Sequence, residues 1–128
     1  MRYLSADHIS NALKRGSSVE QFLGRSPNNP DYIRHIELRP SNGSVELWVY
    51  DAEDIGSEDW LDIYDFPCLD PDGPETPTAT FQDAHSAIVF ASEGLLADVS
   101  RWTNQFISQD EYLDYIRAGR PLRWPVPA

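Results

Sequence analysis

The sequence predicts an α+β fold: an antiparallel meander of three to four strands, flanked by about four short helices. Three observations support this fold class. Segments whose apolar residues recur at helical spacing stand near both ends of the chain, and segments that alternate apolar and polar residues stand between them. Turn signals rich in Gly, Pro and Asn separate the segments. An order of helices, strands and then helices is typical of α+β proteins.

The chain is long enough to build one hydrophobic core. It has 128 residues, of which 41% are hydrophobic and 12% aromatic. Burial of this much apolar surface can offset the conformational entropy that is lost on folding. We find no internal repeat and no boundary in composition, so we expect a single domain over residues 1–128.

Two of the predicted helices lie near the N-terminus. The first covers residues 6–15, with Ser5 as its N-cap and Gly16 after its last turn. The second begins at residues 17–20, Ser-Ser-Val-Glu, a capping box in which the hydroxyl and the carboxylate each accept a backbone hydrogen bond. It carries Phe22 and Leu23 and ends at Gly24.

The other two predicted helices lie in the C-terminal half. One covers residues 83–93, with apolar residues at helical spacing and Gly94 after it. The other begins with a second capping box at residues 108–111, Ser-Gln-Asp-Glu, and ends at Gly119 before Pro121. Arg117 in its last turn complements the negative end of the helix dipole.

The strands are predicted between these two pairs of helices. Residues 32–39 and 44–50 alternate, and the turn signal Pro-Ser-Asn-Gly joins them into a hairpin. Residues 60–66 form a third predicted strand, and residues 101–107 are a candidate fourth. Residues 70–77 are expected to form a surface loop, because their prolines interrupt regular structure. The tail, 121–127, is expected to be extended and to pack through Leu122 and Trp124.

The charge distribution argues against two classes of partner. The net charge is −11 and the isoelectric point is about 4.4, whereas phosphate recognition and anionic membranes require clustered bases. We therefore expect no direct nucleic-acid or membrane binding, and attraction to a basic protein. Residues 51–83 contain eleven acids and no Lys, Arg or His, while the rest of the chain is balanced. These acids are Asp51, Glu53, Asp54, Glu58, Asp59, Asp62, Asp65, Asp70, Asp72, Glu75 and Asp83.

Aromatic residues alternate with these acids. On the predicted strands Trp48 and Tyr50 share a face with Glu46, and Trp60 and Tyr64 share a face with Asp62. Such a face would offer aromatic anchors surrounded by steering charges. Two plainer interpretations remain open: the aromatics are core residues, and the acids are a solvated surface. The candidate partner-binding residues are Trp48, Tyr50, Asp51, Glu53, Asp54, Glu58, Asp59, Trp60, Asp62 and Tyr64.

The residues that usually carry catalysis or bind metal form no recognisable motif. His8, His35 and His85 lack zinc-ligand spacing, so each is expected to be a surface or hydrogen-bonded histidine. Cys68 stands among acids, which raise a thiol pKa and weaken it as a nucleophile. Residues 70–75 could bind a divalent cation weakly, although they lack EF-hand spacing. We therefore expect no cofactor, no metal site and no catalytic residues, with a small carboxylate-dependent hydrolase kept as an alternative.

Aromatic and acidic residues occur together at residues 45–54, Val-Glu-Leu-Trp-Val-Tyr-Asp-Ala-Glu-Asp. With its compact α+β character and acidity, the chain resembles the immunity proteins of bacterial polymorphic-toxin and contact-dependent inhibition systems. The resemblance implies a cytoplasmic inhibitor of a basic toxin, which is often a nuclease. The absence of a signal-peptide or membrane-length apolar run also favours the cytoplasm. A non-catalytic structural or regulatory subunit is the alternative.

Overall fold

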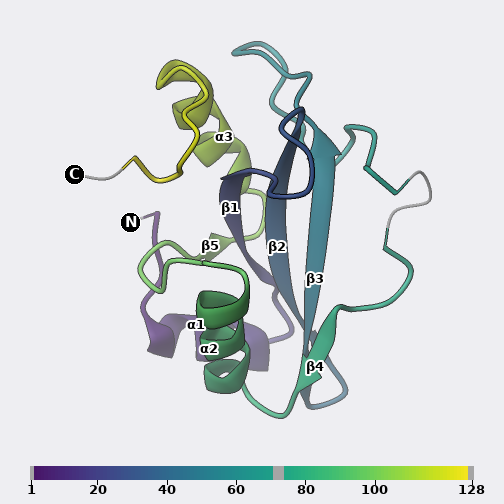
Figure 1. Ribbon diagram of the computed structural model, residues 1–128. Helices are drawn as coiled ribbons and strands as arrows, with labels where there is room; N and C mark the ends of the chain where they lie inside the picture. The colour runs from purple at the N-terminus through teal and green to yellow at the C-terminus, as the bar shows by residue number, and fades with distance from the viewer. Residues whose placement is uncertain (1, 71–73, 127–128) are drawn as a thin grey trace.

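The computed structural model describes residues 2–70 and 74–126, which form an α+β structure with one antiparallel sheet (Figure 1). In the described residues the sheet has five strands rather than three to four, and three helices rather than about four accompany it. The strand order is β4-β3-β2-β1-β5. The strands are β1 (Val19–Arg25), β2 (Tyr32–Ser41), β3 (Ser44–Glu53), β4 (Ala79–Phe81) and β5 (Thr103–Asn104). The helices are α1 (Ala6–Lys14), α2 (Ala84–Gly94) and α3 (Ser108–Arg117).

The central hairpin forms as predicted. β2 and β3 pair in an unbroken register that ends at Ser41 opposite Ser44. Asn42 and Gly43 at the turn both have positive φ, 50° and 82°. Two successive left-handed residues are the mark of a type I′ turn, whose twist matches that of the paired strands. The Asn-Gly pair therefore fixes the hairpin and its register.

Two predicted helices are capped as their sequences indicate, and the third is not. The Ser5 hydroxyl accepts a hydrogen bond from the His8 N–H at the start of α1, and Asp83 accepts one from the Ser86 N–H at the start of α2. The capping box predicted for α3 is wrong. Its N-cap is Ile107, which has no side-chain oxygen, and the Ser108 N–H is instead bound by Glu20 of β1.

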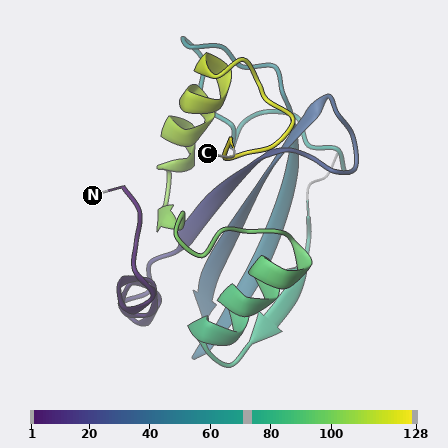
Figure 2. The same ribbon diagram turned by 60° about the vertical axis from the view of Figure 1, so that its left-hand side comes forward.

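Each face of the sheet carries its own core, because alternate residues of a strand point to opposite sides. On the first face, Ile36 and Leu38 of β2 pack with α1 and α2. On the second face, Ile33 packs with Tyr112 and Tyr115 of α3. The helices also lie at different ends of the sheet: α1 and α2 lie beside one end, and α3 lies beside the other (Figure 2).

The predicted second helix is wrong, because its residues form β1. This strand lies between β2 and β5, and Val19 through Phe22 are all buried. Hydrogen bonds on both sides of the strand outweigh the local capping signal at residues 17–20.

The predicted strand at residues 60–66 is also wrong. β4 occupies the outer edge of β3, and residues 54–69 instead form a loop over the second face. Ile63 and Phe66 of this loop insert into the core beside α3. The candidate strand at 101–107 is regular only at Thr103–Asn104, where it pairs with β1.

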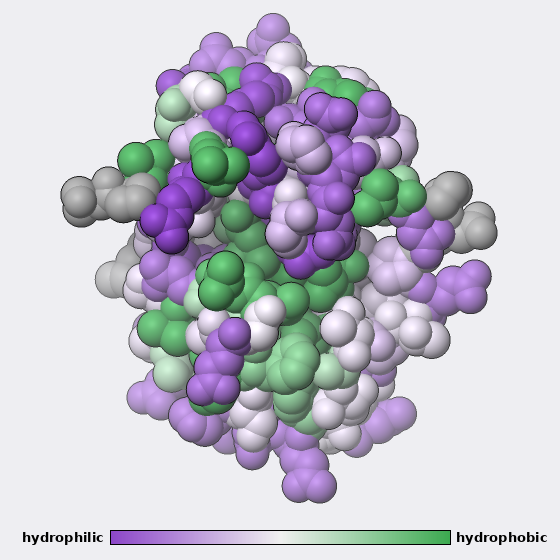
Figure 3. Space-filling view, in the orientation of Figure 1, coloured by the Kyte–Doolittle hydropathy of each residue, from purple (hydrophilic) through white to green (hydrophobic). Residues whose placement is uncertain are grey.

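The tail packs through Trp124, which contacts Tyr115 at a ring-centroid distance of 5.8 Å, whereas Leu122 is 73% exposed. Other exposed apolar residues, including Leu96 and Val99, follow α2. Apolar surface accordingly gathers over α2 and the loop after it (Figure 3). None of the helices in the described ranges has the length and apolar character needed to cross a bilayer.

Candidate binding pocket on the second face of the sheet

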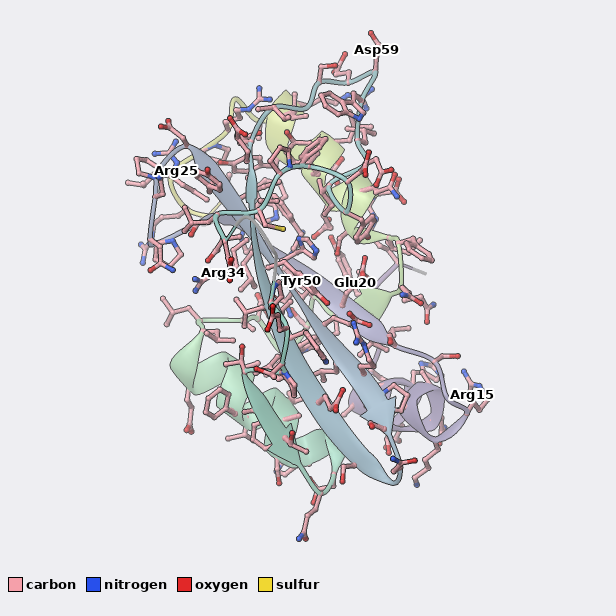
Figure 4. All side chains as sticks on the ribbon, turned by 90° about the vertical axis from the view of Figure 1, so that its right-hand side faces the viewer. Arg15, Glu20, Arg25, Arg34, Tyr50 and Asp59 are labelled. Atoms are coloured by element: carbon pink, nitrogen blue, oxygen red, sulfur yellow. The ribbon has the colours of Figure 1, made fainter. Side chains whose placement is uncertain are left out.

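A pocket of about 290 Å³ opens on the second face of the sheet, beside the core that α3 covers. Figure 4 shows two of its lining residues, Glu20 and Tyr50, at mid-height of the sheet. We call this cavity the sheet pocket. It is lined by Glu20, His35, Glu37, Tyr50, Ala52, Ile63, Tyr64, Cys68, Gln105 and Phe106.

Glu20 is a buried carboxylate that ties β1 to the start of α3. It is 2% exposed, and its Oε1 accepts hydrogen bonds from the Tyr64 hydroxyl, the Phe106 N–H at 2.9 Å and the Ser108 N–H at 3.2 Å. All three of these hydrogen bonds end on the same oxygen, Oε1. Burial raises the pKa of Glu20, and these hydrogen bonds only partly oppose the effect.

Glu37 lies directly opposite Glu20 in the pairing of β1 with β2. Its Oε1 accepts hydrogen bonds from Arg39 at 3.0 Å and from the Tyr50 hydroxyl at 3.2 Å. Burial is the largest single effect on Glu37 and would raise its pKa, but hydrogen bonds from Arg39, Ser18 and Tyr50 and the charge of Arg39 together lower it. Two opposed glutamates are thus shifted in opposite directions.

His35 occupies the floor of the sheet pocket. It is 4% exposed, so it is not the surface histidine that the sequence allows, and its Nδ1 has no hydrogen-bond partner in the described chain. Its ring stacks on Tyr50 at a centroid distance of 4.9 Å and meets the edge of Tyr64 at 5.4 Å. Burial lowers the pKa of His35 to about 4, so the ring is neutral near pH 7.

The aromatic residues of the sheet pocket belong to a longer series of ring contacts, which we call the aromatic row. It begins at Trp48, whose ring is stacked on Tyr50 at 6.5 Å, and continues through His35 and Tyr64. It ends at Phe106, 5.3 Å from Tyr64. Phe106 is 58% exposed and has a φ of 74°, so its ring stands at the surface.

Carboxylates and one arginine flank the aromatic row. The Trp48 indole donates to Glu46 at 3.1 Å, and the Arg39 guanidinium lies 4.2 Å from the centroid of the Trp48 ring. Arg39 also donates to Glu37. One guanidinium therefore already binds an aromatic face and a carboxylate together on this surface.

The structure brings three of the four predicted anchors together. Trp48, Tyr50 and Tyr64 all belong to the aromatic row. Trp60 lies apart, near the tip of loop 54–69, where it contacts Phe66 at 4.8 Å and is 45% exposed. Asp59, its neighbour, lies at one extreme of the molecule, away from Glu20 and Tyr50 (Figure 4).

The predicted steering acids divide into two groups. Three are paired with arginines from outside residues 51–83: Asp51 with Arg34 at 2.8 Å, Asp54 with Arg120 at 3.0 Å and Glu58 with Arg117 at 2.9 Å. Glu53, Asp59 and Asp62 form no ion pair within the described ranges. The free negative charge of this stretch is therefore smaller than the sequence suggests.

Cys68 lines the sheet pocket, and its pKa is raised by burial and by the nearby Asp70 and Asp51, as the sequence predicts. In the described part of the chain, no three His, Cys, Asp or Glu side chains come together as metal ligands. The acidic loop 70–75, considered as a weak cation site, includes residues 71–73, which lie outside the described residues. Pro127, in the predicted tail, also lies outside them.

Sequence reasoning missed Glu20, His35 and Glu37 as site residues. The alternation of β2 places His35 and Glu37 on one face, and the hairpin register places His35 opposite Tyr50. That signal was available from the sequence. Glu20 was hidden, because its segment was assigned to a helix.

Chemically, the carboxylates of the sheet pocket supply hydrogen-bond acceptors, and Gln105 supplies both an acceptor and a donor. The Tyr64 and Tyr50 hydroxyls already donate to Glu20 and Glu37. Two carboxylates with opposite pKa shifts are also the pattern required for acid–base catalysis. Here, however, one carboxylate holds α3 and the other holds Arg39. Comparisons of the chain with protein-family models, with curated proteins and with solved structures give no match.

Proposed function

We propose that this chain is an acidic, non-catalytic binding domain that neutralises a basic protein in the cytoplasm, as an immunity or inhibitor protein does. The observation that carries the proposal is the aromatic row, which lies among Glu20, Glu37 and Glu46 on the second face. Aromatic side chains supply binding energy when a partner removes them from water. Carboxylates around them favour a basic partner and disfavour an acidic one.

The exposure of the tryptophans supports binding over a purely structural role. Trp60 is 45% exposed, and Trp48 is partly exposed. A structural subunit with all its aromatics buried would not offer such anchors. The hydrolase alternative is less favoured, because both carboxylates of the sheet pocket already hold other parts of the fold.

The proposal assigns long-range attraction to the acids that have no ion pair in the described ranges. These are Glu53, Asp59 and Asp62. Arginines already neutralise Asp51, Asp54 and Glu58, so these three contribute less to the field that reaches a partner.

The experiment co-expresses the chain with the protein encoded directly upstream of its gene, which the proposal expects to contain a basic toxin domain, and it measures survival of the host cells. The purified pair is then studied by stopped-flow kinetics. Trp48→Ala should raise the dissociation rate about tenfold or more, because a desolvated tryptophan anchor is lost. Asp59→Lys with Asp62→Lys should slow association and weaken its salt dependence.

Leu96→Ala is the matched control, because Leu96 is an exposed apolar residue in the loop after α2. It should leave both rates unchanged. Failure of the chain to rescue the cells and to bind the toxin domain would refute the proposal. Equal losses in Trp48→Ala and Leu96→Ala would refute the assignment of the surface.

A further inference from the structure

We infer that the sheet pocket is a receptor for one cationic side chain of the partner, an arginine guanidinium. The inference rests on the proposed function, because it names the chemical group that this surface recognises. Four features carry it: the size of the cavity, its excess of hydrogen-bond acceptors, its aromatic walls and its charge.

The size of the sheet pocket suits one side chain. Its volume, about 290 Å³, lies at the lower limit of cavities that hold drug-sized ligands, about 300 Å³. An amino-acid side chain can enter such a cavity while the chain that carries it stays on the surface.

The two carboxylates of the sheet pocket favour a ligand that donates. The hydrogen bonds to Glu20 from the Tyr64 hydroxyl and from the Phe106 and Ser108 N–H groups all end on Oε1, and the contact of Arg39 with Glu37 Oε2 is long, 3.4 Å. His35, which is neutral near pH 7, adds an Nδ1 without a partner in the described chain. Leaving a buried polar atom unpaired costs about 1–3 kcal/mol. A guanidinium offers five donors and no acceptor, so it complements this set.

The walls of the sheet pocket favour a flat cation. The rings of Tyr50, Tyr64 and Phe106 line the cavity. Guanidinium groups stack on aromatic faces and are less strongly hydrated than ammonium groups, so arginine is favoured over lysine here. Arg39 already shows this mode of binding on the same surface, between the Trp48 ring and Glu37.

The sheet pocket contains one buried carboxyl group, Glu20, that no cation of the described residues compensates. Arg39 balances Glu37, but none of the ion pairs in the described residues includes Glu20. A buried carboxylate without a cation is costly, and a bound cation relieves that cost. Glu20 holds the Phe106 and Ser108 N–H groups through Oε1, and a ligand would bind through Oε2.

The experiment titrates isotope-labelled protein with N-acetyl-L-arginine N-methylamide and follows the resonances of His35, Tyr64 and Phe106 by NMR. We expect saturable shifts with a Kd on the order of 1–10 mM, as befits one side chain. The matched probe is the citrulline analogue, which has nearly the same shape without the charge. It should bind at least about tenfold more weakly.

Glu20→Gln should weaken binding of the arginine probe about tenfold, since the amide keeps an oxygen for the Phe106 and Ser108 N–H groups but removes the charge. Glu93→Gln on α2 is the control and should bind normally. Absence of saturable shifts with folded protein, or equal binding of the citrulline analogue, would overturn the inference.

The two proposals fail separately. If the arginine probe does not bind but the toxin domain does, with an affinity that depends on Trp48, the pocket assignment is wrong and the proposed function stands. If the probe binds in the sheet pocket and the toxin domain does not bind the chain, the proposed function is wrong and the pocket assignment stands.

Discussion

Glu20 and Glu37 face each other across β1 and β2, yet their surroundings act on them in opposite ways. Burial raises the pKa of Glu20, which has no ion-pair partner in the described chain. Burial also opposes ionisation of Glu37, but hydrogen bonds from Arg39, Ser18 and Tyr50 and the charge of Arg39 together overcome it and lower the pKa. As pH rises, the contribution of Glu20 to stability therefore falls and the contribution of Glu37 rises.

The pair predicts opposite pH profiles for two conservative variants. Above the unfolded pKa of 4.5, folded Glu20 retains protons that the unfolded chain has released, so its contribution to stability falls as pH rises through the raised native pKa. Glu37 contributes stability above 4.5 that is lost as pH falls through its lowered native pKa. Urea unfolding from acidic to neutral pH measures both effects.

Relative to the native chain, Glu37→Gln should become more destabilising as pH rises toward 4.5, and Glu20→Gln should become less destabilising as pH rises above it. Taking differences from the native chain removes the titration of all other groups. Parallel profiles for the two variants would contradict the assignment of opposite shifts.

At the residue scale, the sequence predicts side chains on regular strands best. The alternation of β3 correctly places Trp48 and Tyr50 on the face opposite Leu47. It could not show that arginines distant in the sequence, such as Arg120, would reach the acids of residues 51–83. Ion pairs of this kind depend on the tertiary fold, which periodicity does not report.

Among the elements, β1 depends most on one residue. The pairing of β1 with β2 shifts register between Phe22 and Gly24, where Gly24 has a φ of +83°. A Cβ at this position would lie 2.6 Å from the Trp124 Cβ. The β-bulge thus requires glycine for two separate reasons: the left-handed backbone and the close approach of the tail.

Gly24→Ala is expected to destabilise the protein more than Gly16→Ala. Gly16 has nearly the same φ, +86°, but a Cβ there would meet nothing within 4 Å. Gly16→Ala should therefore lower the free energy of unfolding only by the cost of a left-handed alanine, about 1–2 kcal/mol. For Gly24→Ala, the free energy of unfolding should fall by this amount and by a further amount from the steric clash. Urea unfolding of both variants measures the two losses. Equal losses would show that Trp124 moves aside freely.

At the element scale, prediction succeeds where local signals and tertiary contacts agree. The hairpin, α1 and α2 have both turn or cap chemistry and an apolar stripe that meets a core. The prediction of a helix at β1 is wrong because the capping signal is local, whereas the hydrogen bonds of this segment are made with β2 and β5. The capping box predicted at the start of α3 is wrong for the same reason, since Glu20 of β1 accepts the hydrogen bond from the Ser108 N–H.

For the whole molecule, the net charge of −11 remains the dominant electrostatic fact. Ion pairs such as Arg34–Asp51 and Arg101–Glu111 neutralise part of the acidic surface. Formation of an ion pair leaves the net charge unchanged, so the folded state still carries a large excess of negative charge. Self-repulsion of that excess destabilises a compact state.

Added salt should therefore stabilise the protein. Raising NaCl from a few mM to about 0.1 M shortens the Debye length to about 10 Å and screens repulsion between distant carboxylates. We expect the thermal midpoint to rise by a few degrees over this range and then level off. KCl at the same concentrations should act equally. A falling midpoint would show that the arginine ion pairs outweigh the repulsion.

At this scale the α+β class and the antiparallel sheet were predictable from the order of the segments, whereas the two-sided core was not. The sequence does not show that residues 54–69 cover the second face, because Ile63 and Phe66 alternate imperfectly and could equally belong to a strand. The sheet pocket lies beside this loop, so its existence could not be predicted either.

The outermost strands of the sheet are very short: β4 has three residues and β5 has two. Beyond β5, Tyr3 bridges to Thr103 and the Leu4 N–H binds the Trp102 carbonyl, so the N-terminal segment shields that border. An incoming strand would find few free backbone groups on either flank, which guards against fibril-like stacking of copies. A partner of the proposed kind would consequently be recognised through side chains rather than by addition of a strand to the sheet.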